Sequence, residues 1–486
     1  MSVVNRFYKI AKKYPEKVAV QGNNKSYTYS QLAALSKKIA HKIRKTEGEH
    51  RVLILLERGA YAYSAMFGSL ISGGYYSTCN IDTPVSKQKK ILEIYKPSVI
   101  VSTKELYKKL VNRTNIKVPL INIEDLSKEP SDIKIKDHKY AYVCFTSGST
   151  GNPKGVIISR KALSSYINWA ILKMELKPSD RWSQHPNISF DLSVLDIYGA
   201  LCSGGTLYPL TSAMDKMMPA QAVKKYKLTI WNSVPSVINM MIKANQIKSS
   251  LLKSLRLASF CGEPLFKEHI ENIFKACPAI TVHNTYGPTE STVSMTLLRI
   301  KKGDNINKIC NGSISIGKAI THTGLRLIGG KNKNEGEIVI TGRQLAEGYW
   351  RLPKETKKSF RKININGKNV KAYFTGDWAI KEKEHIFFKK RIDRQSKIKG
   401  FRIELEAIDN EIRKFTKCLC FSSVENNKLY SFIESTKDKI DIDNLILNLK
   451  EVLDDYCIPS HFIFMKIFPR NESDKIDLKK MIKENI

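Results

Sequence analysis

Short apolar runs of strand length alternate with amphipathic stretches along most of the chain. Three of these runs end in polar loops, as the buried strands of a parallel sheet do: residues 228–234, 255–260 and 279–283. Residues 141–145 and 156–159 are predicted strands on either side of a polar loop. The segment 160–174 then carries apolar side chains at helical spacing, at Leu163, Ile167, Ala170 and Ile171. The pattern predicts an α/β fold with sheets flanked by helices, in which ligands gather at the carboxyl ends of the strands.

The pattern becomes more compact after residue 393. It predicts five elements in series: a helix from about Glu404, strands at 418–424 and 429–433, a helix at 442–453 and a strand at 461–468. We therefore expect a large N-terminal domain of several subdomains, residues 1–392, and a small α+β C-terminal domain, residues 393–486.

The formal charge of +35 is the extreme feature of the composition. Nucleic-acid binding is the first interpretation of so basic a chain. However, the lysines are spread along the whole sequence, and no stretch interleaves basic and aromatic residues as a base-stacking platform requires. We therefore expect no nucleic-acid partner. Two explanations stay open, a solvated lysine-rich surface and electrostatic steering of an acidic protein partner.

The cysteines and the N-terminus indicate the compartment. The nine cysteines show no zinc-type spacing, which favours a reducing environment. The N-terminus has charges throughout and lacks the apolar core of a signal peptide, and no run of about 18 apolar residues occurs. We expect a cytoplasmic protein without membrane insertion.

The loop within "YVCFTSGSTGNPKGV" (142–156) is rich in groups that bind phosphate. It offers backbone N–H groups, hydroxyl donors and one cation, from Thr146, Ser147, Gly148, Ser149, Thr150, Gly151 and Lys154. It is not a Walker A loop, because the lysine is followed by glycine and the loop joins two predicted strands. The alternative is a flexible glycine–serine turn.

Six motifs in sequence order resemble those of the adenylate-forming superfamily, specifically its amino-acid adenylation domains. They are "FTSGSTGNPKG" at Phe145, "FDLS" at Phe190, "NTYGPTE" at Asn284, "GEIVITG" at Gly336, "YFTGDW" at Tyr373 and "RIDRQSKIKGFRIELEAID" at Arg391. The resemblance covers nearly the whole chain. It implies an acetyl-CoA synthetase-like fold with a mobile C-terminal domain, and activation of a carboxylate by ATP and Mg²⁺ to an acyl-adenylate that a thiol then attacks.

The resemblance gives the nucleotide-binding motifs their roles. The 146–154 loop is expected to hold the β- and γ-phosphates, Thr289 to contact the α-phosphate, and Glu290 to carry Mg²⁺. Tyr286 is expected to stack on adenine, and Asn284 to read its amino edge. Two further residues complete the expected set: Asp377, whose carboxylate can accept both ribose hydroxyls, and Arg391, which reaches the sugar or the phosphate. A turn aspartate is the alternative for Asp377.

The C-terminal motifs depart from the family at two points. By its position in "FPRNESDKIDLKK", Lys475 matches the catalytic lysine of the family, but Glu472, Ser473 and Asp474 replace the usual proline, small polar residue and glycine. The alternative is that Lys475 is an ordinary surface lysine and that the protein catalyses adenylation poorly. Asp393 matches the hinge, and residues 397–400 ("KIKG") match the loop that serves the second half-reaction. Lys390 stands where a glycine is common.

The amino-acid pocket is carried over from the family position by position. It comprises Asp191, Leu192, Leu195, Ser233, Ser259, Cys261, Thr285, Val293 and Ser294, closed by Lys475. Asp191 has the chemistry to pair with a substrate ammonium group, although capping the following helix is an alternative role. The two leucines suggest a small cavity. The serines at 259 and 294 stand where apolar residues are expected, so the pocket is predicted to be wider and wetter, and a substrate such as serine would relieve an unpaired hydroxyl.

Within the superfamily, the chain is most similar to the branch of D-alanine ligases that load an acidic carrier protein. No phosphopantetheine attachment motif is present. We therefore expect the thiol on a separate carrier protein, or less favourably on coenzyme A. The alternatives are a stand-alone adenylation enzyme of a nonribosomal peptide pathway that activates serine or L-alanine, and a nucleotide-binding protein without ligase turnover.

Overall fold

The computed structural model describes residues 1–486 apart from 23–24, 81, 127–132, 149–151, 437–439 and 471–475. The described residues form two compact units. Unit 1 comprises Met1–Ile81, Ile94–Phe145 and Gly155–Ile392, and unit 2 comprises Asp82–Glu93, Thr146–Lys154 and Asp393–Ile486. The last boundary coincides with the predicted one at 392/393. The assignment of all of residues 1–392 to one domain stays a prediction, because two short segments group with unit 2.

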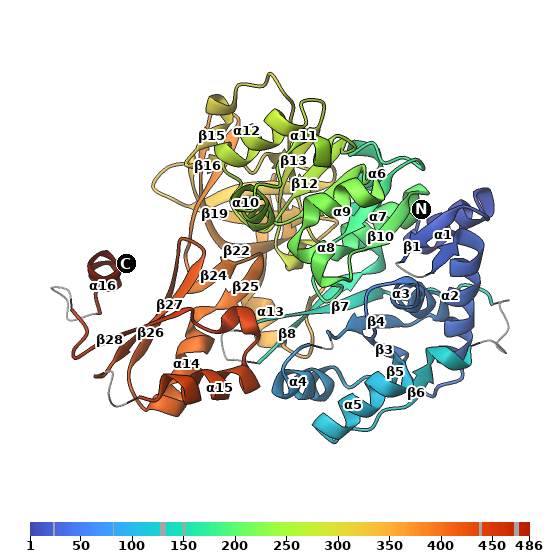
Figure 1. Ribbon diagram of the computed structural model, residues 1–486, viewed down its shortest axis with the longest axis horizontal. Helices are drawn as coiled ribbons and strands as arrows, with labels where there is room; N and C mark the ends of the chain where they lie inside the picture. Colours follow the sequence, from blue (N-terminus) through green and yellow to red (C-terminus); the bar gives the residue numbers. More distant parts are fainter. Residues whose placement is uncertain (23–24, 81, 127–132, 149–151, 437–439, 471–475) are drawn as a thin grey trace. The chain divides into compact units, whose positions relative to one another are not determined.

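A nine-stranded sheet dominates unit 1 (Figure 1). In spatial order its strands are β17 (Lys318–Ala319), β14 (Thr296–Ile300), β13 (Thr281–Tyr286), β12 (Leu257–Phe260), β11 (Ile230–Ser233), β9 (Arg181–Gln184), β10 (Thr206–Pro209), β1 (Val18–Gln21) and β2 (Ser26–Thr28). Strands β13 to β1 in this order are parallel. Their carboxyl ends therefore meet at one edge of the sheet, where open α/β sheets bind ligands.

A second, seven-stranded sheet has the order β20 (Gly348–Tyr349), β8 (Lys154–Ser159), β7 (Tyr140–Thr146), β4 (Tyr75–Thr78), β3 (Arg51–Leu55), β5 (Val99–Ser102) and β6 (Leu120–Asn122). Strands β7 and β8 flank the predicted phosphate loop, so the prediction that this loop joins two strands is confirmed.

Helices cover both faces of the nine-stranded sheet. One core contains residues of both sheets and of the helices α1 (Val3–Lys13), α2 (Tyr29–Arg44), α3 (Ala60–Ser72), α6 (Arg160–Lys173) and α7 (Ser193–Ser203). A second core lies on the other face, under α9 (Pro219–Tyr226), α10 (Pro235–Lys243), α11 (Ser249–Leu252) and α12 (Lys267–Ala276). The remaining helices of unit 1 are α5 (Lys104–Thr114), α8 (Ala213–Met217) and α13 (Pro353–Ser359).

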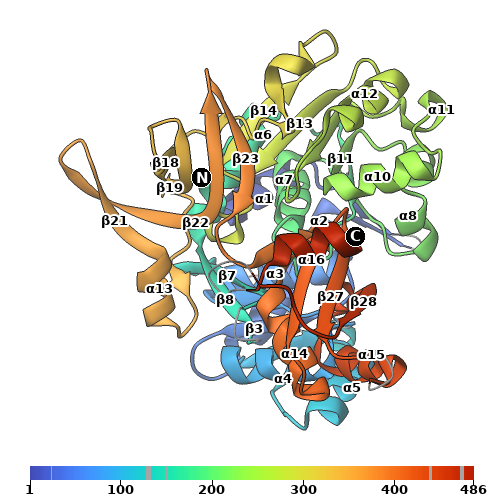
Figure 2. The ribbon, with the colours of Figure 1, turned by 90° about the vertical axis from the view of Figure 1, so that its left-hand side faces the viewer.

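A third sheet of unit 1 contains the longest strand, β22 (Lys368–Glu382), which Figure 2 shows beside its neighbours. The order is β18 (Thr323–Gly329), β19 (Glu335–Gly342), β22 and β21 (Phe360–Ile365), and β23 (His385–Arg391) also pairs with β22. A short hairpin joins β15 (Cys310–Asn311) to β16 (Ser313–Ile314). The register of β22 and β23 places Asp377 opposite Arg391.

Unit 2 contains the predicted small α+β arrangement. A three-stranded sheet, β26 (Cys420–Glu425), β27 (Lys428–Glu434) and β28 (His461–Met465), packs against α14 (Leu405–Thr416) and α15 (Ile442–Val452) on one face and α16 (Leu478–Asn485) on the other. The hairpin β24 (Gln395–Ile398) and β25 (Phe401–Glu404) precedes it, and α4 (Val85–Tyr95) lies mostly in this unit. The predicted α/β fold class and the order of these elements are confirmed.

Candidate active site

Several predicted site residues of unit 1 lie at the carboxyl ends of neighbouring parallel strands. Ser233 ends β11, Cys261 follows β12, and Tyr286 ends β13. The backbone N–H of Cys261 donates to the carbonyl of Ser233, and the Thr285 hydroxyl donates to the carbonyl of Phe260. The strand ends are therefore tied together where the sequence predicts a binding site.

Tyr286, Asp377 and Arg391 form one buried cluster. The Tyr286 hydroxyl donates to Asp377 Oδ2 at 2.5 Å, and Arg391 Nη1 donates to Asp377 Oδ1 at 2.7 Å and to the carbonyl of Thr375 at 2.7 Å. Burial, and then the charge of Asp377, raise the pKa of Tyr286, so the phenol stays protonated and can donate. Each oxygen of Asp377 already accepts one bond and keeps lone pairs for a second donor.

Asn284 lies on β13 with its amide held by backbone. Its Nδ2 donates to the carbonyl of Ser315 at 2.8 Å and more weakly to that of Ile314 at 3.4 Å. The side chain is thereby oriented with Nδ2 committed, which presents Oδ1 as the acceptor. An acceptor is what the amino group of adenine requires, so the geometry is compatible with the predicted role.

Glu290 is buried in a short 3₁₀ turn, η2 (Thr289–Ser291), and Thr289 beside it is half-buried. The Tyr349 hydroxyl donates to Glu290 Oε1 at 2.8 Å, and the N–H of Ala346 donates to the Glu290 carbonyl. Within the described parts of the chain, no group of three or more His, Cys, Asp or Glu side chains is arranged to hold a metal. A single fixed carboxylate suits Mg²⁺, which takes one or two carboxylates together with substrate phosphates.

Asp191 lies just before α7. The N-cap residue is Leu192, with no side-chain cap, and the Asp191 carbonyl accepts from the N–H of Val194. The roles of Asp191, pairing with a substrate ammonium group or capping the helix, both stay predictions. Leu192 is half-buried, and Leu195 is buried one turn into the helix.

Tyr166 on α6 connects the predicted pocket residues. Ser294 Oγ donates to the Tyr166 hydroxyl at 3.2 Å, and both side chains are buried. Burial raises the pKa of Tyr166, and the hydrogen bond from Ser294 only partly opposes this, so the phenol stays protonated. Cys261 Sγ in turn contacts the carbonyl of Val293 at 3.8 Å. Helix α6 thus supplies a pocket residue that the motifs do not include.

Ser233 and Ser259 point to opposite faces of the nine-stranded sheet. Ser233 Oγ accepts from Trp231 Nε1 at 2.8 Å, and Trp231 belongs to the core under α9 to α12. Ser259 pairs in register with Asn232, the neighbour of Ser233, and successive side chains of a strand alternate between faces. Ser259 therefore faces α6 and α7 with the other pocket residues, whereas Ser233 does not.

The predicted phosphate loop belongs to unit 2. Gly148 is required there, because a Cβ at this position would lie 2.2 Å from the carbonyl oxygen of Asn152. The Thr146 hydroxyl donates to the Lys154 carbonyl at 3.4 Å, and the Ser147 hydroxyl donates to the Arg402 carbonyl at 2.6 Å. Ser149, Thr150, Gly151 and Lys475 lie outside the described residues.

The predicted hinge and the following loop also lie in unit 2. Asp393 Oδ1 accepts from the N–H of Gln395 at 3.2 Å. The "KIKG" segment comprises the end of β24 and the two-residue turn to β25, in which Lys399 and Gly400 have φ values of 50° and 81°. Two consecutive residues with positive φ are typical of a tight type I′ turn.

Three residues of the site were not predicted: Tyr166, Tyr349 and Thr375. Tyr166 lies on the buried face of α6 but is not one of the positions that predict this helix. Thr375 lies within the "YFTGDW" motif but received no role there. No sequence signal identifies Tyr349, because it contacts Glu290 across 59 positions of sequence.

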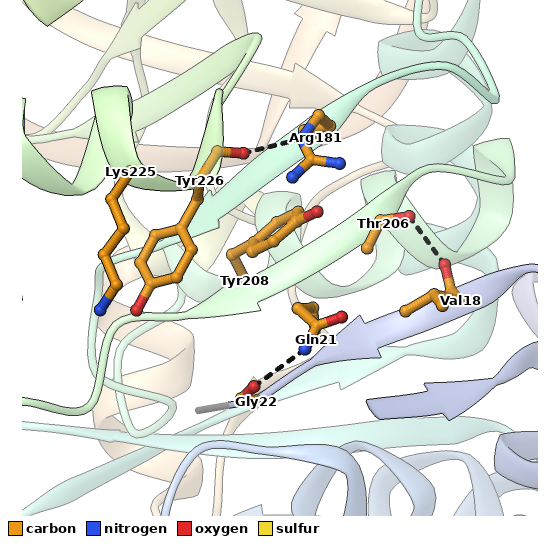
Figure 3. A pocket seen from close by; sticks show the side chains of 8 residues that line it. All are labelled: Val18, Gln21, Gly22, Arg181, Thr206, Tyr208, Lys225 and Tyr226. Atoms are coloured by element: carbon orange, nitrogen blue, oxygen red, sulfur yellow. Dashed lines mark hydrogen bonds between the residues drawn. The ribbon is translucent and has the colours of Figure 1, made fainter. Parts of the chain in front are cut away.

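A separate pocket of about 480 Å³ lies over β1 and β10, and Figure 3 shows its lining. It contains none of the predicted site residues. Three of its polar side chains are bonded to nearby backbone: Arg181 Nε donates to the Tyr226 carbonyl, the Thr206 hydroxyl to the Val18 carbonyl, and Gln21 Nε2 to the Gly22 carbonyl. This pocket is therefore distinct from the candidate site.

Comparison with known proteins identifies the family. A family model described as "AMP-binding enzyme" matches residues 7–350. The chain belongs to this family. The D-alanine–D-alanyl carrier protein ligases of Staphylococcus aureus strain RF122 and Staphylococcus epidermidis strain RP62A are each 30% identical to it, over 99% of this chain and 98% of the relative. The predicted membership of the adenylate-forming superfamily is confirmed.

Solved structures share the fold. The Vibrio cholerae adenylation domain AlmE, solved in complex with glycyl-adenosine-5'-phosphate, is 25% identical with a TM-score of 0.85, covering 99% of this chain and 97% of its own. An NRPS protein containing adenylation and PCP domains is 22% identical with a TM-score of 0.85, over 99% of this chain and 84% of its own. Among the helices that the structure describes, none combines the length and apolarity that crossing a bilayer requires.

Proposed function

We propose that this protein is a ligase that activates D-alanine with ATP and transfers it to the phosphopantetheine thiol of a separate carrier protein. The observation that carries the proposal is the full-length similarity to ligases named for that reaction, 30% identical over 99% of the chain. The buried cluster of Tyr286, Asp377 and Arg391 supports the nucleotide part, because it offers a ring face, a carboxylate and a cation together.

In the first half-reaction, a carboxylate oxygen of the amino acid attacks the α-phosphorus of ATP, and the bond from that phosphorus to pyrophosphate breaks. Asp377 would accept the ribose hydroxyls, Asn284 Oδ1 would accept from the adenine amino group, and Thr289 would contact the α-phosphate. Fixed donors and cations near developing negative charge lower such a barrier without reorganisation. Lys154, Arg391 and Lys475 would supply the cations.

Mg²⁺ would be held by Glu290 and would neutralise phosphate charge when bound. The Tyr349 hydroxyl donates to the Glu290 carboxylate, and Glu290 is buried. Both features hold this carboxylate in place.

The amino acid would lie beside Tyr166. Asp191 would pair with its ammonium group, and Leu192, Leu195, Cys261 and Val293 would limit the side-chain volume. A buried leucine and a cysteine bounding the space favour a small side chain over an aromatic one.

In the second half-reaction, the carrier thiolate attacks the acyl carbon, and AMP leaves with the oxygen that bridged to phosphorus. We assign Asp393 as the hinge for the change between the two half-reactions, because a hinge needs only one or two residues that absorb a large backbone rotation. The 397–400 turn would then serve the second step.

The proposal is tested by ATP–pyrophosphate exchange with D-alanine, L-alanine and glycine, followed by mass spectrometry of a phosphopantetheinylated carrier protein. We expect exchange that depends on D-alanine and a carrier mass increased by one alanyl group. Exchange with L-alanine or glycine but not D-alanine would contradict the substrate, and absence of exchange with every amino acid would contradict the reaction.

A further inference from the structure

Three polar side chains stand in register across the middle of the nine-stranded sheet. Asn232 on β11 pairs with Ser259 on β12, and Ser259 pairs with His283 on β13. All three are buried, with at most 1% of their surface exposed. Paired residues on adjacent strands point to the same face, so the three side chains form one polar row.

This polar row faces the predicted amino-acid pocket. Asn232 Nδ2 donates to Asp196 Oδ1 on α7 at 2.7 Å and to the Leu192 carbonyl at 3.3 Å. Cys261, two residues after Ser259 and therefore on the same side of the chain, contacts the Val293 carbonyl. The row and the pocket residues thus share the face that packs against α6 and α7.

The row contains hydrogen-bonding atoms with no partner within the described residues. They are Asn232 Oδ1, Ser259 Oγ, and both ring nitrogens of His283. Burial lowers the pKa of His283 to about 3, so the ring is neutral and one of its nitrogens is an acceptor. Buried polar atoms are almost always paired, with protein, water or a ligand.

Helix α6, which packs on the same face of the sheet, adds one more hydroxyl, from Tyr166. Tyr166 accepts from Ser294, so its own O–H remains available as a donor, and the structure gives it no acceptor in the described part of the chain. The residues of the predicted pocket and of α6 thus combine the unpartnered hydroxyl of Ser259 with the phenol of Tyr166. Two hydroxyls and two acceptors are more than a methyl side chain can use.

We infer that this pocket selects an amino acid whose side chain carries a hydroxyl, serine in preference to alanine, with Ser259 and Tyr166 as the residues that determine the choice. The inference rests on the proposed reaction, amino-acid activation followed by transfer to a carrier thiol, and replaces alanine by serine as the preferred substrate. Pairing one substrate hydroxyl with Ser259 satisfies an atom that alanine leaves unpaired, and a site built to bond a hydroxyl discriminates against the analogue that lacks it.

The test measures kcat/KM in ATP–pyrophosphate exchange for D-serine, L-serine, D-alanine and L-alanine. The unmodified protein is expected to favour serine over the alanine of the same hand by about fivefold or more, the lower end of what pairing a buried hydroxyl contributes. Ser259→Ala should remove most of this preference, and Tyr166→Phe should reduce it. Each variant's thermal unfolding is recorded beside the kinetics.

Ser254→Ala is the matched control. Ser254 also carries a buried hydroxyl without a partner, but it precedes the amino end of β12, away from the pocket. Its serine-to-alanine ratio should equal that of the unmodified protein.

The outcomes distinguish the inferred serine preference from the proposed ligase reaction. Exchange that prefers alanine, or a ratio that Ser259→Ala leaves unchanged, overturns the inference and leaves the ligase proposal standing. Preference for L-serine over D-serine supports the inference about the side chain and contradicts the proposal that the substrate is a D-amino acid. Absence of exchange with all four amino acids contradicts both.

Discussion

Asp377→Asn is the most informative single change at the nucleotide site. The substitution keeps the shape of the side chain and removes its charge. In the structure, Asp377 accepts from Tyr286 at 2.5 Å and from Arg391 at 2.7 Å, and the two ion-pair side chains are only 6% and 16% exposed. Asparagine offers one oxygen in place of two, so it cannot accept from both partners and from both ribose hydroxyls.

The expected magnitude follows from these contacts. A hydrogen bond to a charged group contributes about 1.5–3 kcal/mol, and removing one partner of a fully buried pair costs about 3–5 kcal/mol. Arg391 keeps some contact with water and a bond to the Thr375 carbonyl, so the lower range applies. A loss of about 1.5–3 kcal/mol in nucleotide binding corresponds to a Kd for AMP raised about tenfold or more.

Isothermal titration of AMP measures this change, with circular dichroism to confirm the fold. Tyr226→Phe is the matched control, because it removes another tyrosine hydroxyl that donates to a buried aspartate, Asp215, at 3.3 Å outside the site. If Asp377→Asn binds AMP within twofold of the unmodified protein while remaining folded, the assignment of the ribose site is refuted.

Three further predictions concern the loop, a buried acid and the C-terminal lysine. Gly148→Ala should impair ATP use at least tenfold in kcat/KM, because its Cβ would lie 2.2 Å from the Asn152 carbonyl; an unchanged value would show that the loop does not need this glycine. Burial raises the pKa of Asp196, so its carboxyl keeps a proton in the folded state that the unfolded state releases above about pH 4. The free energy of unfolding should therefore decrease as the pH rises above about 4. Asp196→Asn should therefore be more stable than the unmodified protein at pH 7 and equally stable near pH 3 in chemical denaturation, and equal stability at pH 7 would contradict an acid protonated by burial. Lys475→Ala should slow adenylation at least about 100-fold, because the lysine stabilises charge in that transition state, and should have little effect on transfer from preformed adenylate. The control Lys483→Ala should change neither the adenylation rate nor the transfer rate. A full adenylation rate in Lys475→Ala would show that this lysine is not catalytic.

The local pattern was sufficient to predict most elements near the site. The predicted helix at 160–174 is α6, Arg160–Lys173, and the three apolar runs before the polar loops became β11, β12 and β13. Hydrophobic spacing determines which residues face a core, so these elements follow from nearby sequence. The predicted strand 461–468 ends at Met465, because pairing with β27 stops there.

Features that depend on distant contacts were not predictable in the same way. The spacing that identified α6 did not include Tyr166, whose hydroxyl meets Ser294 across 128 positions of sequence. The opposite orientation of Ser233 and Ser259 depends on where each residue falls in its strand, which strand ends do not fix. The grouping of residues 82–93 and 146–154 with unit 2 likewise depends on packing between remote segments.

The central claim is that an amino-acid carboxylate attacks the α-phosphorus of ATP, and oxygen labelling tests it most directly. The protein is supplied with ATP, a carrier protein and an amino acid whose carboxylate carries ¹⁸O, and the products are analysed by mass spectrometry. The account predicts one ¹⁸O atom in AMP and none in pyrophosphate. Label in inorganic phosphate, with ADP as the nucleotide product, would contradict it, because the γ-phosphorus would then be the atom attacked.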